Sequence, residues 1–214
     1  MKQYNKKKTG IIVLLLGVTA LFLWTLWANT ALECSVITLF DKNLPVEFSG
    51  FTIAQVSDLH NAEFGKNNTA LLQLLKETGP DMIAITGDLV DSRRTDISVA
   101  LRFAEQAAAI APVYYVTGNH ESRLDEFSEP EAGLKTAGAI LLRNESTMLE
   151  REGAQIRLIG LDDPSFAAQT NASKWADTML DTWGKVQDKA SFTVLLSHRP
   201  ERFRFIEHIR WIWC

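Results

Sequence analysis

The chain has 214 residues, of which 46% are hydrophobic and 22% are charged. This composition is typical of a globular domain and excludes a disordered chain, a collagen-like repeat and a small disulfide-stapled scaffold. With 22 Lys and Arg against 26 Asp and Glu, the formal net charge is -4, so there is no basic surplus and specific nucleic-acid binding is not expected.

Residues 11–28 predict a transmembrane helix. They form a run of eighteen residues without a charge, and about 17–25 apolar residues span a bilayer. Trp24 and Trp27 lie near the end of the run, where interfacial aromatics are enriched, and the lysines at positions 2, 6, 7 and 8 precede it. By the positive-inside rule we expect residues 1–28 to be a single-pass anchor in the cell membrane, with a cytoplasmic N-terminus and an extracytoplasmic remainder. A cleaved signal peptide is the alternative, and it would make the protein secreted.

The rest of the chain alternates β-rich apolar runs with helical patterns, which predicts a layered α/β domain. Residues 29–50 are interpreted as a connector, residues 51–203 as the domain and residues 204–214 as an atypical tail. Thr95 or Asp96 is expected to cap the second predicted helix. The predicted strands are residues 51–56, 82–86, 113–117, 139–142, 155–161 and 192–196, and the predicted helices are residues 67–78, 99–110 and 173–189.

Four of the predicted strands end in side chains that can bind a metal ion. Binding sites in parallel α/β sheets form outside the carboxyl ends of the strands, where the loops converge. Each cluster taken alone is also an ordinary turn or helix-capping sequence, but four clusters at four strand ends predict one metal site. The clusters are Asp58 with His60, Asp88 after Gly87, Asn119 with His120, and His198 after Ser197.

The types of ligand narrow the chemistry of this site. One residue separates Asp58 from His60, so in an extended backbone both side chains project to the same side. Asp88 has two carboxylate oxygens and can bridge two cations, and Asn119 offers a neutral carbonyl oxygen. This mixed set of oxygen and nitrogen ligands suits Mn, Fe or Zn better than an ion that prefers thiolates.

These residues resemble the signature of the calcineurin-like metallophosphoesterase superfamily, and the sequence around them resembles its membrane-anchored bacterial branch. The resemblance implies two facing β-sheets flanked by helices, with a dinuclear metal site at the strand ends. It also implies a phosphate-ester substrate, a phosphomonoester or a phosphodiester, that is attacked by a hydroxide held by two divalent metal ions. The matching motifs are Asp58-x-His60, Gly87-Asp88, Gly118-Asn119-His120-Glu121 and His198.

The resemblance further implies a role for each residue. His120 is the expected catalytic residue, which would stabilise or protonate the leaving oxygen. Glu121 would either orient His120 or be solvated at the surface. The expected metal ligands are Asp58, His60 and the bridging Asp88 for one ion, and Asp88, Asn119 and His198 for the other.

The family signature ends in a Gly-His-x-His motif that this sequence lacks. The histidine after His198 is His208, which has no preceding glycine and no second histidine beside it, and a helical surface position is the favoured interpretation. We therefore expect a sandwich that is incomplete at its C-terminal end, with one ligand of each metal missing. Two functions remain open: a metal-dependent phosphoesterase, and a truncated non-catalytic remnant that binds metal weakly or not at all.

Overall fold

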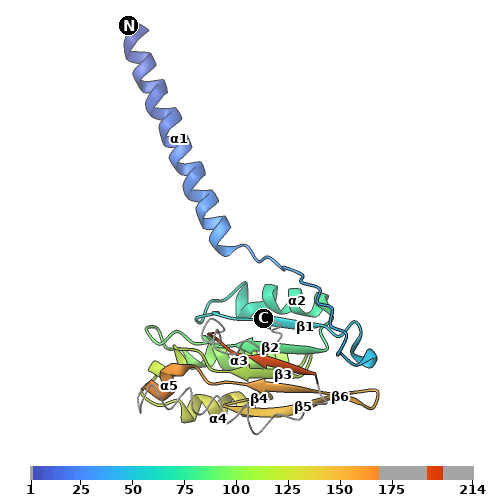
Figure 1. The fold of residues 1–214 in the computed structure, drawn as a ribbon. Helices are drawn as coiled ribbons and strands as arrows, with labels where there is room; N and C mark the ends of the chain where they lie inside the picture. The colour runs from blue at the N-terminus through green and yellow to red at the C-terminus, as the bar shows by residue number, and fades with distance from the viewer. Residues whose placement is uncertain (1, 169–191, 200–214) are drawn as a thin grey trace. The chain divides into compact units, whose positions relative to one another are not determined.

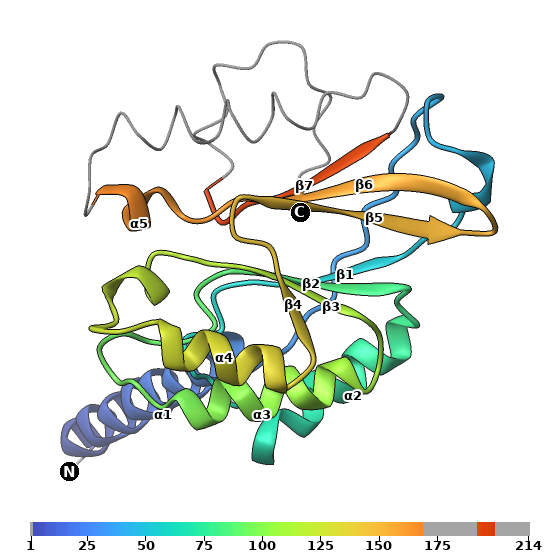
Figure 2. The same ribbon diagram turned by 90° about the horizontal axis from the view of Figure 1, so that it is seen from below.

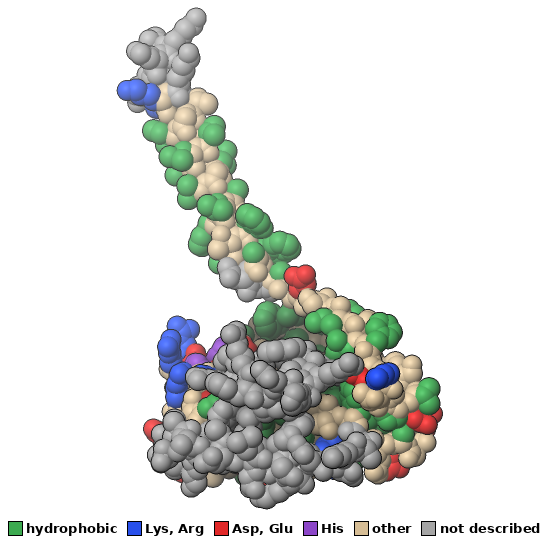
Figure 3. Space-filling view, in the orientation of Figure 1, with side chains coloured by type: hydrophobic (Ala, Val, Ile, Leu, Met, Phe, Trp, Pro, Cys, Tyr) green, Lys and Arg blue, Asp and Glu red, His purple; other side chains and the backbone are tan. Residues whose placement is uncertain are grey.

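The computed structural model describes residues 2–168 and 192–199. The chain divides into two compact units, Met1–Val36 and Ile37–Cys214. The first unit contains helix α1 (Lys2–Thr30), in which the candidate span Lys7–Ala28 includes an 18-residue stretch with a mean hydropathy of 2.4 and no buried residues. Hydrophobic side chains are distributed along the length of the described part of α1 (Figure 3). Its length and apolar surface agree with the predicted anchor, and a signal sequence would have the same two properties.

Four parallel strands form the first sheet of the second unit, in the order β1-β2-β3-β4. The register places Val56, Ile85 and Tyr115 in one row, so the first three strands end at about the same level. Every residue of β2 is buried, as expected of a central parallel strand that is covered on both faces. The strands are β1 (Ile53–Val56), β2 (Met82–Thr86), β3 (Val113–Val116) and β4 (Ala139–Leu141).

The second sheet contains β5 (Glu145–Arg151), β6 (Ala154–Gly160) and β7 (Thr193–Leu196), in that order. β5 and β6 form an antiparallel hairpin, and β7 pairs parallel to β6. The two-residue turn of the hairpin has positive φ at Glu152 and Gly153, at 53° and 85°, which matches the twist of the paired strands. The sequence pattern did not predict β5, because Leu149 is its one buried residue and the rest of this edge strand is polar or exposed.

The two sheets pack face to face, and helices α2, α3 and α4 cover the opposite face of the first sheet (Figures 1 and 2). The predicted sandwich of two facing sheets with flanking helices is therefore confirmed. The helices are α2 (Thr69–Thr78), α3 (Ile97–Ala108), α4 (Ser128–Thr136) and α5 (Pro164–Ala168), with short helices η1 (Val46–Phe48), η2 (Lys66–Asn68) and η3 (Glu121–Arg123). The core between the sheets includes Met82, Ala84, Tyr114 and Val116 from the first sheet and Leu149, Ile156, Leu158, Val194 and Leu196 from the second.

The helix boundaries follow local sequence chemistry. Asp96 caps α3, since its Oδ1 accepts a hydrogen bond from the backbone amide of Ser98 at 3.0 Å, as the capping pattern predicted. Helix α4 was not predicted, because Pro130 and Gly133 interrupt its apolar periodicity. The helix expected at residues 173–189 and the expected tail at residues 204–214 lie outside the described residues.

Candidate metal centre

The loops that follow β1 and β2 lie side by side at the carboxyl edge of the first sheet. The backbone amides of Asp58 and His60 donate to the carbonyl oxygens of Gly87 and Asp88, at 3.1 and 2.9 Å. Asp58, His60 and Asp88 have φ of 55°, 47° and 52°, and this left-handed backbone costs about 1–2 kcal/mol for each residue that carries a Cβ. The hydrogen bonds between the loops therefore hold three expected metal ligands in an otherwise unfavourable conformation.

Two glycines allow the loops after β2 and β3 to approach each other. A Cβ at Gly118 would overlap the carboxylate and the backbone nitrogen of Asp88. A Cβ at Gly87, where φ is 93°, would lie 2.7 Å from Gly118 Cα and 2.8 Å from His198 Nδ1. Both glycines are needed because no side chain fits between these backbones.

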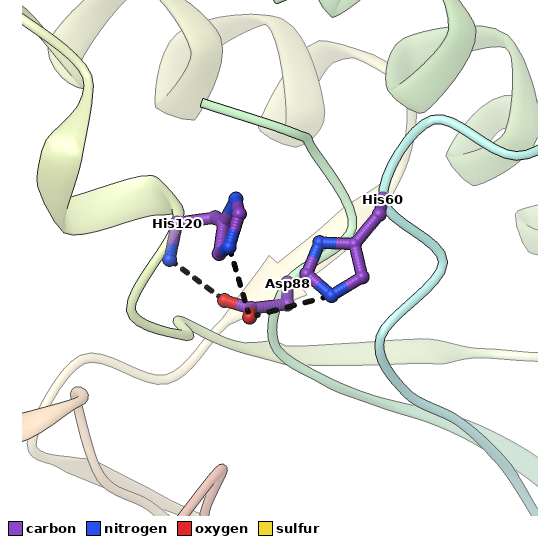
Figure 4. A group of neighbouring side chains, drawn as sticks. All are labelled: His60, Asp88 and His120. Carbon is purple, nitrogen blue, oxygen red and sulfur yellow. Dashed lines mark hydrogen bonds and ion pairs between the residues drawn. The ribbon is translucent and has the colours of Figure 1, made fainter. Parts of the chain in front are cut away.

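Asp88 is the centre of the site, and its side chain is only 4% exposed. Its Oδ1 accepts a hydrogen bond from the backbone amide of His120 at 2.7 Å. Its Oδ2 faces three imidazole nitrogens, the Nε2 atoms of His60, His120 and His198, at 3.7, 4.0 and 3.5 Å. Figure 4 shows His60 and His120 on either side of this carboxylate. Burial would raise the pKa of Asp88, but His198 and His120 together hold it below its usual value.

The three distances from Asp88 Oδ2 are longer than hydrogen bonds, and the shortest, 3.5 Å to His198 Nε2, matches the separation of two ligands of one cation. A hydrogen bond would bring nitrogen and oxygen to about 2.7–3.2 Å, whereas ligands that share a cation at about 2.0–2.2 Å lie roughly 3–3.5 Å apart. His60 Nδ1 is buried and has no hydrogen-bond partner in the part of the chain that the structure describes. Among the described residues, two groups place their ligand atoms within 4.8 Å of one another: His60, Asp88 and His120, and Asp58, Asp88 and His198.

Asp88 is common to both groups, as expected of a bridging ligand, but its partners are divided differently from the expected sets. His60 groups with His120, although its Nε2 is also 3.7 Å from Asp58 Oδ1. Asn119 Oδ1 lies 3.4 Å from His198 Nε2, so the expected pair of Asn119 and His198 is also brought together. The structure therefore brings Asp88, the other four expected ligands and His120 together in one cluster.

His198 presents Nε2 to the site. Its Nδ1 lies 2.9 Å from the carbonyl oxygen of Thr86, and since a carbonyl can only accept, Nδ1 carries a proton. Burial would lower the pKa of His198, but Asp88, the Thr86 carbonyl and Asp58 raise it to about 9. When the doubly protonated ring of His198 loses its Nε2 proton, the free lone pair is on Nε2. This nitrogen faces Asp88 and Asn119.

His120 has the opposite tautomer. The backbone amide of Ser92 donates to His120 Nδ1 at 3.1 Å, so in the neutral ring the proton is on Nε2, the nitrogen that faces Asp88. A protonated Nε2 donates a hydrogen bond and does not ligate a metal. Asp91 Oδ1 also lies 3.4 Å from Nδ1. This geometry agrees with a role as proton donor and separates His120 from the other two histidines.

Glu121 is fully buried, so the expectation of a solvated surface side chain is wrong. Its Oε2 accepts hydrogen bonds from the backbone amides of Asp88 and Gly118, at 2.9 and 2.8 Å, and its Oε1 accepts from that of Val90 at 3.2 Å. Through these hydrogen bonds, Glu121 links the loop after β2 to the loop after β3. Because these three donors are backbone amides, the first effect of Glu121 is on the backbone that carries Asp88.

Two charged residues near the site carried no signal in the sequence. The stretch around Asp163 is an ordinary turn by its composition, and Arg199 was considered only as part of a strand exit. In the structure the two form an ion pair, with Arg199 Nε 2.8 Å from Asp163 Oδ2. Arg199 Nη2 also donates to Asn119 Oδ1 at 3.0 Å. Only the folding of the two sheets together brings these residues to the metal centre.

The sequence model of the calcineurin-like phosphoesterase family matches residues 51–211, which is more than half of the chain. The matched residues include the strands of both facing sheets and the cluster of carboxylates and histidines at the strand ends. The chain belongs to the calcineurin-like phosphoesterase family.

Curated relatives of the chain are also metallophosphoesterases. The uncharacterized metallophosphoesterase YkoQ of Bacillus subtilis (strain 168) is 30% identical over 163 residues, which cover 73% of this chain and 60% of that protein. A transmembrane protein with metallophosphoesterase domain from Bos taurus is 27% identical over 165 residues, which cover 73% of this chain and 37% of the relative. The chain thus spans less than two thirds of the length of these proteins.

Among solved structures, the protein TT1561 of Thermus thermophilus matches with a TM-score of 0.50 and 14% sequence identity, over 68% of this chain and 66% of that one. At this identity the likeness concerns the fold alone. It agrees with the mixed α/β sandwich described above.

Proposed function

We propose that this protein is a metal-dependent phosphoesterase that hydrolyses a phosphomonoester or a phosphodiester. The observation that carries the proposal is the convergence of three imidazole Nε2 atoms on the buried Oδ2 of Asp88, at 3.5–4.0 Å. Membership of the calcineurin-like phosphoesterase family supports the reaction class.

Asp58, His60, Asp88, Asn119 and His198 would hold two divalent cations, with Asp88 as the shared ligand. When bound, two such cations lower the pKa of a water molecule and neutralise the phosphate oxygens, so that hydroxide attacks phosphorus in line. The ligands are carboxylate, amide and imidazole groups, and these admit Mn, Fe or Zn. The protein's own contribution is to hold the five side chains in place through the strained, hydrogen-bonded loops.

His120 would assist departure of the leaving group. Its Nε2 proton is directed toward Asp88, where it can donate a hydrogen bond to the leaving oxygen. The Ser92 amide, which donates to Nδ1 at 3.1 Å, keeps the ring proton on Nε2, where it can be donated to that oxygen.

Helix α1 would anchor the enzyme in the cell membrane as a single pass, with the N-terminus in the cytoplasm and the catalytic domain outside it. The apolar segment Lys7–Ala28 and the lysines that precede it support this arrangement. A bovine relative that is itself described as a transmembrane protein supports it as well. The substrate would then be a phosphate ester on the extracytoplasmic side.

The test uses the full chain purified in detergent, with Asp88→Ala as the site variant and Asp125→Ala as the control. Asp125 is an exposed aspartate in the loop after η3. Metal content is measured by elemental analysis, and hydrolysis of bis(4-nitrophenyl) phosphate and 4-nitrophenyl phosphate is measured with added Mn²⁺. We expect about two ions per chain and measurable hydrolysis, both lost in Asp88→Ala and both retained in Asp125→Ala.

Two outcomes would contradict the proposal. Equal rates of hydrolysis in the unmodified chain and in Asp88→Ala would show that the activity does not come from this site. Metal content near zero in the unmodified chain, without hydrolysis, would favour the alternative of a non-catalytic protein that binds metal weakly or not at all.

A further inference from the structure

Arg199 reaches the metal centre from the end of β7, directly after His198. Its Nη2 donates a hydrogen bond to Asn119 Oδ1 at 3.0 Å, and its Nε lies 2.8 Å from Asp163 Oδ2. We infer that Arg199, held by Asp163, is a positioning residue that orients the Asn119 amide for metal binding. The inference rests on the proposed function, because it assumes that Asn119 is a metal ligand.

The chemistry of the amide explains why it needs such a partner. An asparagine side chain presents either its carbonyl oxygen or its NH₂ group to a neighbour when the amide turns over, and only the oxygen binds a cation. A guanidinium has donors and no acceptor, so Arg199 selects the oxygen. Asn119 Oδ1 has two lone pairs: one accepts from Arg199, and the other is available on the side of His198 Nε2, 3.4 Å away.

Asp163 fixes the arginine in turn. Its side chain is 0% exposed, and a buried carboxylate is strongly unfavourable unless a cation pairs with it. Its Oδ1 accepts a hydrogen bond from the backbone amide of Ser165 at 2.8 Å, and its own amide donates to Thr117 Oγ1 at 3.1 Å. Thr117 lies two residues before Asn119, so the ion pair is tied to the same loop that carries the amide.

The charges of this arrangement are matched. Arg199 alone would repel a divalent cation bound by Asn119, but the carboxylate of Asp163 compensates its charge at 2.8 Å. The guanidinium can therefore stay beside the metal centre and act through its directed hydrogen bond. Hydrogen bonds of this kind, from a group that does not itself bind the metal, typically change metal affinity by about 10–100-fold.

The test measures binding of Mn²⁺ alone to the full chain in detergent by isothermal titration calorimetry. Arg199→Met removes both the hydrogen-bond donors and the charge of the guanidinium. Arg199→Lys retains the charge but lacks the planar set of donors. Asp163→Asn removes the carboxylate that pairs with Arg199. Arg123→Met is the matched control, because Arg123 is an exposed arginine in η3. We expect Arg199→Met to weaken Mn²⁺ binding about tenfold, Arg199→Lys and Asp163→Asn to weaken it less, and Arg123→Met to leave it unchanged.

A double-mutant cycle separates positioning from a general effect on the fold. If Arg199 acts through Asn119, Arg199→Met has no further effect on Mn²⁺ affinity in the Asn119→Ala background. Wild-type affinity in Arg199→Met and in Asp163→Asn, tighter binding in Arg199→Met, or the same tenfold loss in the Asn119→Ala background would each overturn the inference. If the unmodified chain shows no Mn²⁺ binding that Asp88→Ala abolishes, the proposed function fails and this inference fails with it.

Discussion

Glu121 Oε2 accepts a hydrogen bond from the backbone amide of Asp88 at 2.9 Å, across 33 residues of sequence. The same oxygen also accepts from the amide of Gly118 at 2.8 Å. One buried carboxylate thus sets the distance between the two loops that carry Asp88 and Asn119. The position of Asp88, the expected bridging ligand, therefore depends on the buried side chain of Glu121.

Replacing Glu121 by glutamine should therefore weaken the fold and the metal site together. The new NH₂ group faces backbone donors and leaves at least one of them unsatisfied, which costs about 2–3 kcal/mol of unfolding free energy. Urea unfolding of Glu121→Gln, followed by circular dichroism, measures this loss. Glu105→Gln is the control, because Glu105 is an exposed glutamate on α3. If Glu121→Gln were as stable as Glu105→Gln, the carboxylate would not hold these loops.

Substitution of Gly118 by alanine should destabilise the protein through a steric clash. The added Cβ would overlap the carboxylate and backbone of Asp88, and because backbone cannot move aside cheaply, we expect a loss of about 3 kcal/mol. Gly133→Ala is the same substitution in helix α4, where the Cβ would meet only the flexible end of Leu101 at 2.9 Å. We expect Gly133→Ala to be nearly neutral, since alanine favours the helix. Equal thermal unfolding midpoints for the two variants would contradict this account.

His120→Asn should separate leaving-group assistance from metal binding. The asparagine oxygen can replace Nδ1 as the acceptor of the Ser92 amide, but nothing replaces the Nε2 proton. We expect unchanged metal content and a loss in kcat of about 100-fold or more with phenyl phosphate esters. The loss should be smaller with 4-nitrophenyl esters, whose leaving group needs less protonation. A loss of bound metal in His120→Asn would instead make His120 a ligand.

Glu131 should make a pH-dependent contribution to the free energy of unfolding, at a position away from the candidate metal site. Burial would raise its pKa, but hydrogen bonds from Lys135 and Arg143 hold the pKa below its ordinary value of 4.5. A carboxyl whose pKa is lowered by folding contributes stability above its unfolded-state pKa, and this contribution is lost as the pH falls through the folded-state value.

We therefore expect Glu131→Gln to lose about 1–2 kcal/mol of unfolding free energy near pH 7. The difference from the unmodified chain should shrink below a pH of about 4.5 and nearly vanish at still lower pH. Urea unfolding as a function of pH measures it, with the exposed Glu129 as the control position. A difference that stays constant across this range would rule out the ion pairs as its source.

Cys34 allows the orientation of the chain in the membrane to be measured. It is an exposed free cysteine four residues after the end of α1. With Cys214 changed to serine, we expect Cys34 to react with a membrane-impermeant maleimide in intact spheroplasts, because the proposed orientation places it on the extracytoplasmic side. The variant with both cysteines replaced gives the background. Labelling only after the membrane is opened would place the domain in the cytoplasm.

The sequence by itself determined the positions of most strands along the chain, the α/β class and the identity of the residues at the strand ends. These features depend on local patterns: apolar runs predict buried strands, and polar residues directly after them predict a site where loops converge. Asp58, His60, Asp88, Asn119, His120 and His198 were all expected near one another, and the structure brings them together. Strand β5 and helix α4 escaped prediction because their apolar patterns are weak.

Only the tertiary structure decided how these groups are held. The tautomer of His198 is set by the Thr86 carbonyl, 112 residues away in sequence, and that of His120 by the amide of Ser92. The burial of Glu121 and the pairing of Asp163 with Arg199 likewise depend on segments that meet only when the strands and sheets assemble. Hydrogen-bond partners and burial are properties of contacts between distant residues, and a local sequence pattern carries no information about them.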